Sequence, residues 1–188
     1  MIITNVIISI SMVVWFLTIF RQKNSSFFLF FLILGLSDPL NLLGLKIFGI
    51  TNGVIYTIAC IIFYFVFRFN NVRSFKLKYF DYIIFLVFLY VVITLEYVYY
   101  FYLGVHLFIL SKFIQRIITD LHLRDEFSIY FLILVFYQLS ALLKIIVFLS
   151  GTASGLYLFF ITLAFQILIA IFFIVFREDD PKLKIKMT

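Results

Sequence analysis

The apolar stretch from Tyr82 to Thr119 places the strongest limit on what this chain can fold into. A helix that crosses a bilayer needs roughly 20 apolar residues, so the stretch is too long for one crossing and about right for two. Its middle holds Glu96, Gly104 and His106 together with four tyrosines, Tyr97, Tyr99, Tyr100 and Tyr102. Because tyrosine is enriched where a membrane meets water, the stretch predicts two transmembrane helices joined by a turn at the lipid headgroups.

The composition of the whole chain agrees with a lipid environment. Hydrophobic residues make up 65% of the 188 residues and charged residues only 13%, whereas ordinary soluble domains are about 45–50% apolar. Such a chain has too little polar surface to cover a globular core, so we expect one multi-pass membrane domain. The formal net charge is +6. Its basic residues lie in short clusters between apolar runs, which indicates anionic lipid headgroups rather than nucleic acid as their partner.

Seven apolar runs predict seven helices, because backbone polar groups in lipid must be satisfied within their own segment. The runs are far too long for barrel strands and show no alternation of polar and apolar residues. The predicted fold class is all-α: a polytopic bundle of seven transmembrane helices over residues 1–176, followed by a polar cytoplasmic tail, 177–188. The predicted helices span about 2–20, 27–45, 54–69, 80–97, 102–119, 127–149 and 156–176.

The basic residues also predict an orientation, since cytoplasmic loops carry an excess of Lys and Arg. With the N-terminus outside and the C-terminus in the cytoplasm, the inner loops and tail hold twelve of the fifteen basic residues: Arg21, Lys23, Arg68, Arg73, Lys76, Lys78, Arg116, Arg124, Arg177, Lys182, Lys184 and Lys186. The other three, Lys46, Lys112 and Lys144, lie where a long side chain can extend to a headgroup. We therefore expect a multi-pass protein of the bacterial inner membrane.

Asp38 is the ionisable residue that most needs an explanation, because charge at membrane depth is expensive. It lies about 18 Å along its helix from the cytoplasmic end, at 1.5 Å per residue. Pro39 beside it removes a backbone donor, and Asn41 follows one turn later. Two interpretations stay open. Asp38 is either a proton, cation or ligand site at a kinked helix, or it marks the outer end of a short helix.

Glu96, His106 and Lys144 are all expected in the outer half of the bundle. A buried charge needs a partner, so Glu96 could pair with Lys144 or with His106. One interpretation is a polar pocket open to the outside, formed by Asp38, Asn41, Glu96, His106 and Lys144. The alternative is a structural ion pair, or side chains that only reach the headgroups.

Other kinds of chemistry have little support in the sequence. It has no GxSxG, HExxH, P-loop or GxGxxG motif, so we expect no catalytic residues and no cofactor. The two histidines fall on opposite sides of the membrane in the predicted topology, which excludes a histidine-rich metal site. Cys60 is the only cysteine, and its apolar surroundings predict a buried, inert thiol.

The last two runs read EFSIYFLILVFYQLSALLKIIVFLSG and LYLFFITLAFQILIAIFFIVFRED. Together with the abundance of Phe, Ile and Tyr, they resemble the small seven-helix membrane proteins common in Bacteroidota, some of which occur next to sensor histidine kinases. The resemblance covers the layout of the whole chain and carries over no functional residues.

These observations favour a non-enzymatic membrane sensor or accessory subunit that uses the polar pocket. Because the loops are short and no output domain is evident, such a sensor is expected to act through a partner protein at the basic inner loops or the tail. An alternative is a membrane-embedded, lipid-active enzyme or small carrier that uses Asp38, Glu96 and His106. A third interpretation is a purely structural subunit of a larger membrane complex.

Overall fold

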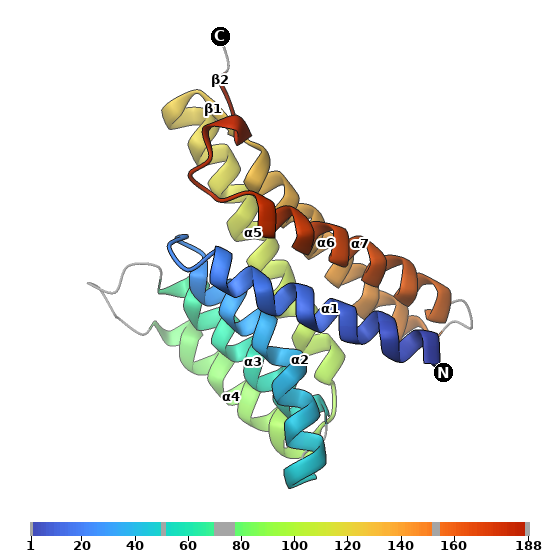
Figure 1. Cartoon of the computed structure of the whole chain (residues 1–188). Coiled ribbons are helices and arrows are strands. Elements are labelled where there is room, and N and C mark those ends of the chain that lie inside the picture. Colours follow the sequence, from blue (N-terminus) through green and yellow to red (C-terminus); the bar gives the residue numbers. More distant parts are fainter. Residues whose placement is uncertain (1, 50–51, 70–77, 152–154, 187–188) are drawn as a thin grey trace.

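The computed structural model describes residues 2–49, 52–69, 78–151 and 155–186, and within them the fold is all-α with seven helices (Figure 1). A short antiparallel pair of strands and one 3₁₀ turn, Pro181–Leu183, complete it. The helices are α1 (Ile2–Arg21), α2 (Phe28–Phe48), α3 (Asn52–Arg68), α4 (Tyr79–Thr94), α5 (Val98–Arg124), α6 (Ile129–Ser150) and α7 (Gly155–Val175). The strands are β1 (Glu126–Ser128) and β2 (Lys184–Lys186).

Four of these helices are long and apolar enough to cross a membrane: α2, α5, α6 and most of α7, over Tyr157–Val175. The other three are shorter apolar helices where they are described. Large apolar side chains cover the outside of the molecule, among them Leu86, Ile93 and Leu168. In a membrane protein this surface faces lipid, so the bundle does not need a polar exterior.

Six of the helices form a closed ring. Around it, α1 packs against α2, α2 against α3, α3 against α5, α5 against α6, α6 against α7, and α7 against α1. We call this arrangement the six-helix ring. The remaining helix, α4, lies outside the ring against α3 and α5, and only Asp81 and Val91 of α4 are buried.

One end of the bundle carries most of the basic residues that the structure describes, and we call it the basic end. It comprises the C-terminal ends of α1, α3, α5 and α7 and the N-terminal ends of α2, α4 and α6. Arg21, Arg68 and Arg124 lie in the last turns of α1, α3 and α5. Arg73 and Lys76, which the sequence also assigns to this side, lie outside the described residues.

The C-terminal segment folds back across the basic end. β2 pairs antiparallel with β1, placing Ile185 opposite Phe127 and Lys186 opposite Glu126. The Glu178 carboxylate accepts hydrogen bonds from the backbone N–H of Ser26 (2.8 Å) and from its hydroxyl (2.7 Å). The tail is therefore structured and attached to two helix connections, which its polar composition did not predict (Figure 1).

The structure extends α5 beyond its predicted end near residue 119 to Arg124. Asp120 pairs with Arg116 at 3.3 Å and with Arg124 at 3.8 Å, each one helical turn away. Such i,i+4 pairs support a helix after its apolar run has ended. The loop expected between the fifth and sixth apolar runs is thus mostly helix.

The connection between α4 and α5 settles the position of Glu96, which lies between the two helices rather than inside one. α4 ends at Thr94, earlier than the predicted residue 97, because Leu95 adopts a left-handed conformation with φ 54°. Tyr97 does the same with φ 56° before α5 begins. Two non-glycine residues in this unfavourable region produce the tight turn.

α2 continues through Asp38 and Pro39 to Phe48, so Asp38 lies inside a helix and not at its outer end. Pro39 has no N–H to donate to the carbonyl of Gly35, which loses its usual partner in the helix. At Gly35, α1 and α2 approach each other closely. A Cβ atom there would lie 2.7 Å from the backbone oxygen of Trp15.

Candidate functional site

A cavity of about 660 Å³ lies inside the six-helix ring. All six helices of the ring line it, together with Leu95 from the α4–α5 turn. Most lining residues come from the N-terminal halves of α1, α3, α5 and α7, and from the middle and C-terminal parts of α2 and α6, whereas Trp15, Phe30 and Phe63 line it nearer the basic end. The cavity therefore lies in the half of the bundle away from the basic end, and its volume is in the range of small-molecule sites.

An aromatic cluster separates the cavity from the basic end. Phe30 and Phe63 line the cavity, with ring centroids 5.4 Å apart. Behind them Phe67 and Phe113 pack edge to face at 5.2 Å, and Phe113 is fully buried. These packed rings lie between the cavity and the basic end, so the structure favours a pocket that ends at this cluster over a channel through the bundle.

Asp38 lines the cavity from α2 and is half-buried. The hydroxyl of Tyr56, on α3, donates a hydrogen bond to the Asp38 carboxylate. Tyr56 is also a lining residue. Asp38 is in no ion pair among the residues that the structure describes, so a neutral hydroxyl is its recorded side-chain partner.

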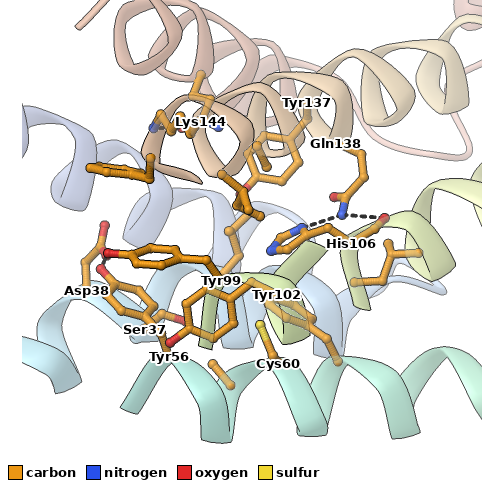
Figure 2. A pocket seen from close by; sticks show the side chains of 18 of the residues that line it. Ser37, Asp38, Tyr56, Cys60, Tyr99, Tyr102, His106, Tyr137, Gln138 and Lys144 are labelled. Atoms are coloured by element: carbon orange, nitrogen blue, oxygen red, sulfur yellow. Dashed lines mark hydrogen bonds between the residues drawn. The ribbon is translucent and has the colours of Figure 1, made fainter. Parts of the chain in front are cut away.

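Lys144 lines the cavity from α6 and is also half-buried (Figure 2). Its ammonium group donates a hydrogen bond to the side-chain oxygen of Gln166, on α7, and lies 5.1 Å from the centre of the Phe159 ring. Gln166 in turn donates to the Ser140 hydroxyl at 2.9 Å. Within the described ranges no carboxylate lies within ion-pair distance of Lys144.

His106 lines the cavity from α5, on the other side of the view from Asp38 (Figure 2). The side-chain nitrogen of Gln138 donates to the backbone oxygen of His106 at 3.2 Å and approaches the ring Nδ1 at 2.5 Å. A backbone carbonyl can only accept, so the Gln138 atom facing it is the amide nitrogen. Nδ1 is then the acceptor, and the neutral ring carries its proton on Nε2.

Glu96 and Asn41 do not line the cavity. Glu96 is exposed, and its carboxylate accepts a hydrogen bond from the Tyr90 hydroxyl at 3.2 Å. Asn41 is buried, and its side-chain oxygen has no hydrogen-bond partner in the described structure. Of the five residues expected in one polar pocket, the structure brings together Asp38, His106 and Lys144. The constellation of Asp38, Glu96 and His106 expected for an enzyme is not assembled.

Several lining residues were not among the predicted site residues, including Tyr56, Tyr99, Tyr102 and Gln166. The spacing on α5 contained a signal: Tyr99, Tyr102 and His106 recur at i, i+3 and i+7, which places them on one helix face. The sequence interpretation assigned these tyrosines to the membrane surface. Tyr102 instead is buried and donates to the backbone oxygen of Gly53 at 2.9 Å.

Hydrogen bonds cross most of the ring's helix contacts in the cavity half. Tyr56 links α3 to α2, Tyr102 links α5 to α3, Gln138 links α6 to α5, and Lys144 links α6 to α7. α1 differs within the described residues. From Val6 onward, its side-chain bonds to α7 come from Thr18 and Arg21, and Gln22 just past its end also donates to α7; all three residues lie in the half nearer the basic end.

The described residues contain no group of three His, Cys, Asp or Glu side chains that could hold a metal ion. What the cavity offers is a carboxylate, an ammonium group and an imidazole within aromatic walls. Comparison with known protein families, curated proteins and solved structures finds no match for this chain. The fold and helix hydropathy therefore define a class, a helical protein with several candidate membrane-spanning segments, and the cavity is the feature from which a function can be inferred.

Proposed function

We propose that this protein is a non-enzymatic sensor or accessory subunit of the bacterial inner membrane that binds a small molecule in the cavity and acts through a partner protein. In this proposal all seven helices cross the membrane, with the N-terminus outside and the C-terminus in the cytoplasm. The observation that carries the proposal is the cavity itself, built by six helices and containing Asp38, His106 and Lys144. Charged side chains in a membrane segment are costly, so their gathering around one cavity supports a binding role.

The position of the cavity supports the proposed orientation. The cavity occupies the half of the bundle opposite the basic end, and basic residues favour the cytoplasmic side. A ligand would then enter from the outer side, while the basic end faces anionic headgroups and the partner. In this proposal the ligand cavity lies toward the outer side of the membrane, and the contact surface for the partner lies on the cytoplasmic side.

A cysteine introduced into the cavity wall provides a direct test. Val98 lines the cavity at the start of α5 and is half-buried, whereas the native Cys60 is buried at 5% exposure. In the Cys60→Ala background, a small, membrane-impermeant methanethiosulfonate added to intact spheroplasts should modify the cysteine of Val98→Cys, whereas a bulky maleimide polymer should not. Cys60→Ala alone is the control without a thiol. Modification of Val98→Cys only after the membrane is permeabilised would contradict access from outside.

The orientation can be tested in the Cys60→Ala background with one new cysteine at each end of the bundle. Phe48→Cys, at the exposed end of α2, should be labelled in intact spheroplasts. Lys23→Cys, at the basic end, should be labelled only after permeabilisation. The reverse pattern would overturn the proposed topology and leave the fold unaffected.

The partner is proposed to contact the exposed basic residues of the tail. A photo-crosslinking residue at Lys182 should capture one and the same protein in repeated experiments. The same residue at Leu168, on the exposed apolar surface of α7, is the matched control. Equal capture at both positions would argue against a partner at the basic end.

A further inference from the structure

Two opposite charges face one cavity without forming an ion pair. The Asp38 carboxylate and the Lys144 ammonium group belong to residues that line the same cavity, yet no ion pair within 4.0 Å joins them in the part of the chain that the structure describes. Each has a neutral partner instead, Tyr56 for the carboxylate and Gln166 for the ammonium group. A carboxylate can accept about four hydrogen bonds and an ammonium group donates three, so both keep free capacity.

This arrangement discriminates between ligands by charge. A cationic ligand would be attracted by Asp38 and repelled by Lys144, and an anionic ligand would meet the opposite pair of effects. Like-charge contacts in a desolvated site reject the wrong ligand. A ligand that carries both charges avoids repulsion and gives each of the two half-buried side chains the charged partner that it lacks.

The remaining walls of the cavity suit an apolar body. Trp15, Phe63, Phe148 and Phe159 line it together with aliphatic side chains. Aromatic walls bind flat apolar groups, and they also attract the positive end of a ligand through the ring faces. The charged pair would therefore bind the charged groups of a ligand, and the aromatic walls would bind its apolar part.

We propose that the cavity binds an amphipathic zwitterion, with its ammonium group against Asp38, its acid group against Lys144 and its apolar part against the aromatic walls. This inference rests on the proposed function, namely that the cavity is a ligand site. The chemistry has two possible sources: a free molecule of the aromatic amino acid type, or the headgroup of a zwitterionic phospholipid.

The test measures how strongly a probe slows modification of Val98→Cys, in the Cys60→Ala background, by the small methanethiosulfonate in nanodiscs of phosphatidylglycerol alone. Three probes share one ring system: tryptophan carries both charges, tryptamine only the positive charge and indole-3-propanoate only the negative charge. Tryptophan should protect the introduced cysteine at concentrations at least about tenfold lower than the other two, since each of those loses one charged contact. A second arm omits the probes and adds phosphatidylethanolamine to the nanodiscs. Protection in that arm alone identifies the lipid headgroup as the ligand.

Two variants should change this preference in opposite ways. Asp38→Asn should abolish the advantage of tryptophan over indole-3-propanoate, and Lys144→Gln its advantage over tryptamine. If lipid alone protects, both variants should abolish the protection. Glu96→Gln and Lys112→Gln remove the same charges outside the cavity and should change nothing. If one cavity variant does not fold, the loss of preference expected for the other variant decides the test.

Equal protection by the three probes without protection by phosphatidylethanolamine, or no protection in either arm, would overturn the zwitterion proposal. So would wild-type preferences in the folded cavity variants. In each of these cases Val98→Cys would still be modified from outside in spheroplasts, and the proposed function would stand. Failure of outside modification would instead remove the proposed function itself.

Discussion

At the scale of single residues, some buried polar side chains in this protein find their partners on neighbouring helices. Asp81 shows this best, with 1% of its surface exposed. Its carboxylate accepts from the Tyr64 hydroxyl (2.6 Å), from Arg68 Nε (3.1 Å) and from the backbone N–H of Lys78 (2.7 Å). These bonds attach α4 to the end of α3, so Asp81 contributes to fold rather than to the cavity.

Asp81→Asn should lower the free energy of unfolding by about 2–3 kcal/mol, because it leaves Arg68 without its charged partner at a largely buried position. Tyr64→Phe removes one hydrogen bond and should cost about 1 kcal/mol. Asp179→Asn is the control: its carboxylate is 75% exposed and pairs with Arg177, so the change should stay below about 0.5 kcal/mol. Denaturation of the three variants in mild detergent gives the comparison, and equal effects would refute the role of burial.

The sequence indicated some of the cavity residues but not their partners. Asp38, His106 and Lys144 stand out because ionisable groups are rare in apolar runs. Their partners Tyr56, Gln138 and Gln166 are ordinary residues of membrane helices. The order of the helices around the ring decides which of these partners lies next to which ionisable residue. Glu96 misled the prediction because an ionisable residue between two runs looks alike in a helix and in a turn.

At the scale of helices, the contact between α1 and α2 depends on Gly35. Gly35→Ala should lower the free energy of unfolding by about 1–3 kcal/mol, because the new Cβ overlaps the backbone of Trp15 and the two helices have to separate. Gly104→Ala is the matched control, since apart from the adjoining backbone of its own helix no described atom lies within 4 Å of its added Cβ, and the better helix propensity of Ala should leave stability equal or slightly higher. Equal losses in thermal unfolding would contradict the close approach.

Helix α4 should tolerate change on most of its surface, because it packs outside the ring. Val91 is buried at 2% exposure, whereas Leu86 is 65% exposed. Val91→Ala should cost about 1–2 kcal/mol of unfolding free energy through lost packing, and Leu86→Ala less than about 0.5 kcal/mol. Thermal unfolding of both variants in nanodiscs measures this. An effect of Leu86→Ala as large as that of Val91→Ala would show that the exposed face of α4 is covered in the folded protein.

The helices themselves were predictable, and the breaks within them were less so. Long apolar runs predict helices because the lipid offers no other partner for the backbone. The sequence left open that Pro39 marks a helix end, but α2 continues through Pro39 to Phe48. Leu95 and Tyr97 carry no sequence mark of a left-handed conformation, since such positions usually favour glycine. The turn between α4 and α5 was consequently placed too late.

At the scale of the whole molecule, the C-terminal segment ties the basic end together. In a Cys60→Ala background, cysteines at Phe127 and Ile185 should form a disulfide under mild oxidation, because β1 and β2 place these residues opposite each other. Cysteines at Phe127 and Asp179 should not. A protease site is introduced between the two cysteines and cleaved after oxidation. If the disulfide has formed, the two fragments stay joined on a non-reducing gel. No bond at the first pair would show that the tail does not fold back.

The ring could not be deduced from the sequence. Helices in lipid are apolar on all sides, so their sequences do not reveal which face is inside. Polar residues restrict the faces only where they occur, as on α5. The paired strands escaped prediction for a related reason: three residues at each strand are too few to show a pattern, and their pairing depends on the fold that brings them together.

The hydrogen bonds of α1 have a consequence for how molecules reach the cavity. In the cavity half, the other neighbouring helices of the ring are joined by side-chain bonds, whereas the described bonds of α1 to α7 lie nearer the basic end. The structure describes the side chains of α1 from Val6 onward, and among these a tilt of α1 about the basic end would break few hydrogen bonds while moving Trp15. Such a tilt would open the ring sideways beside α1, so in the proposed topology a molecule dissolved in the outer leaflet would enter there.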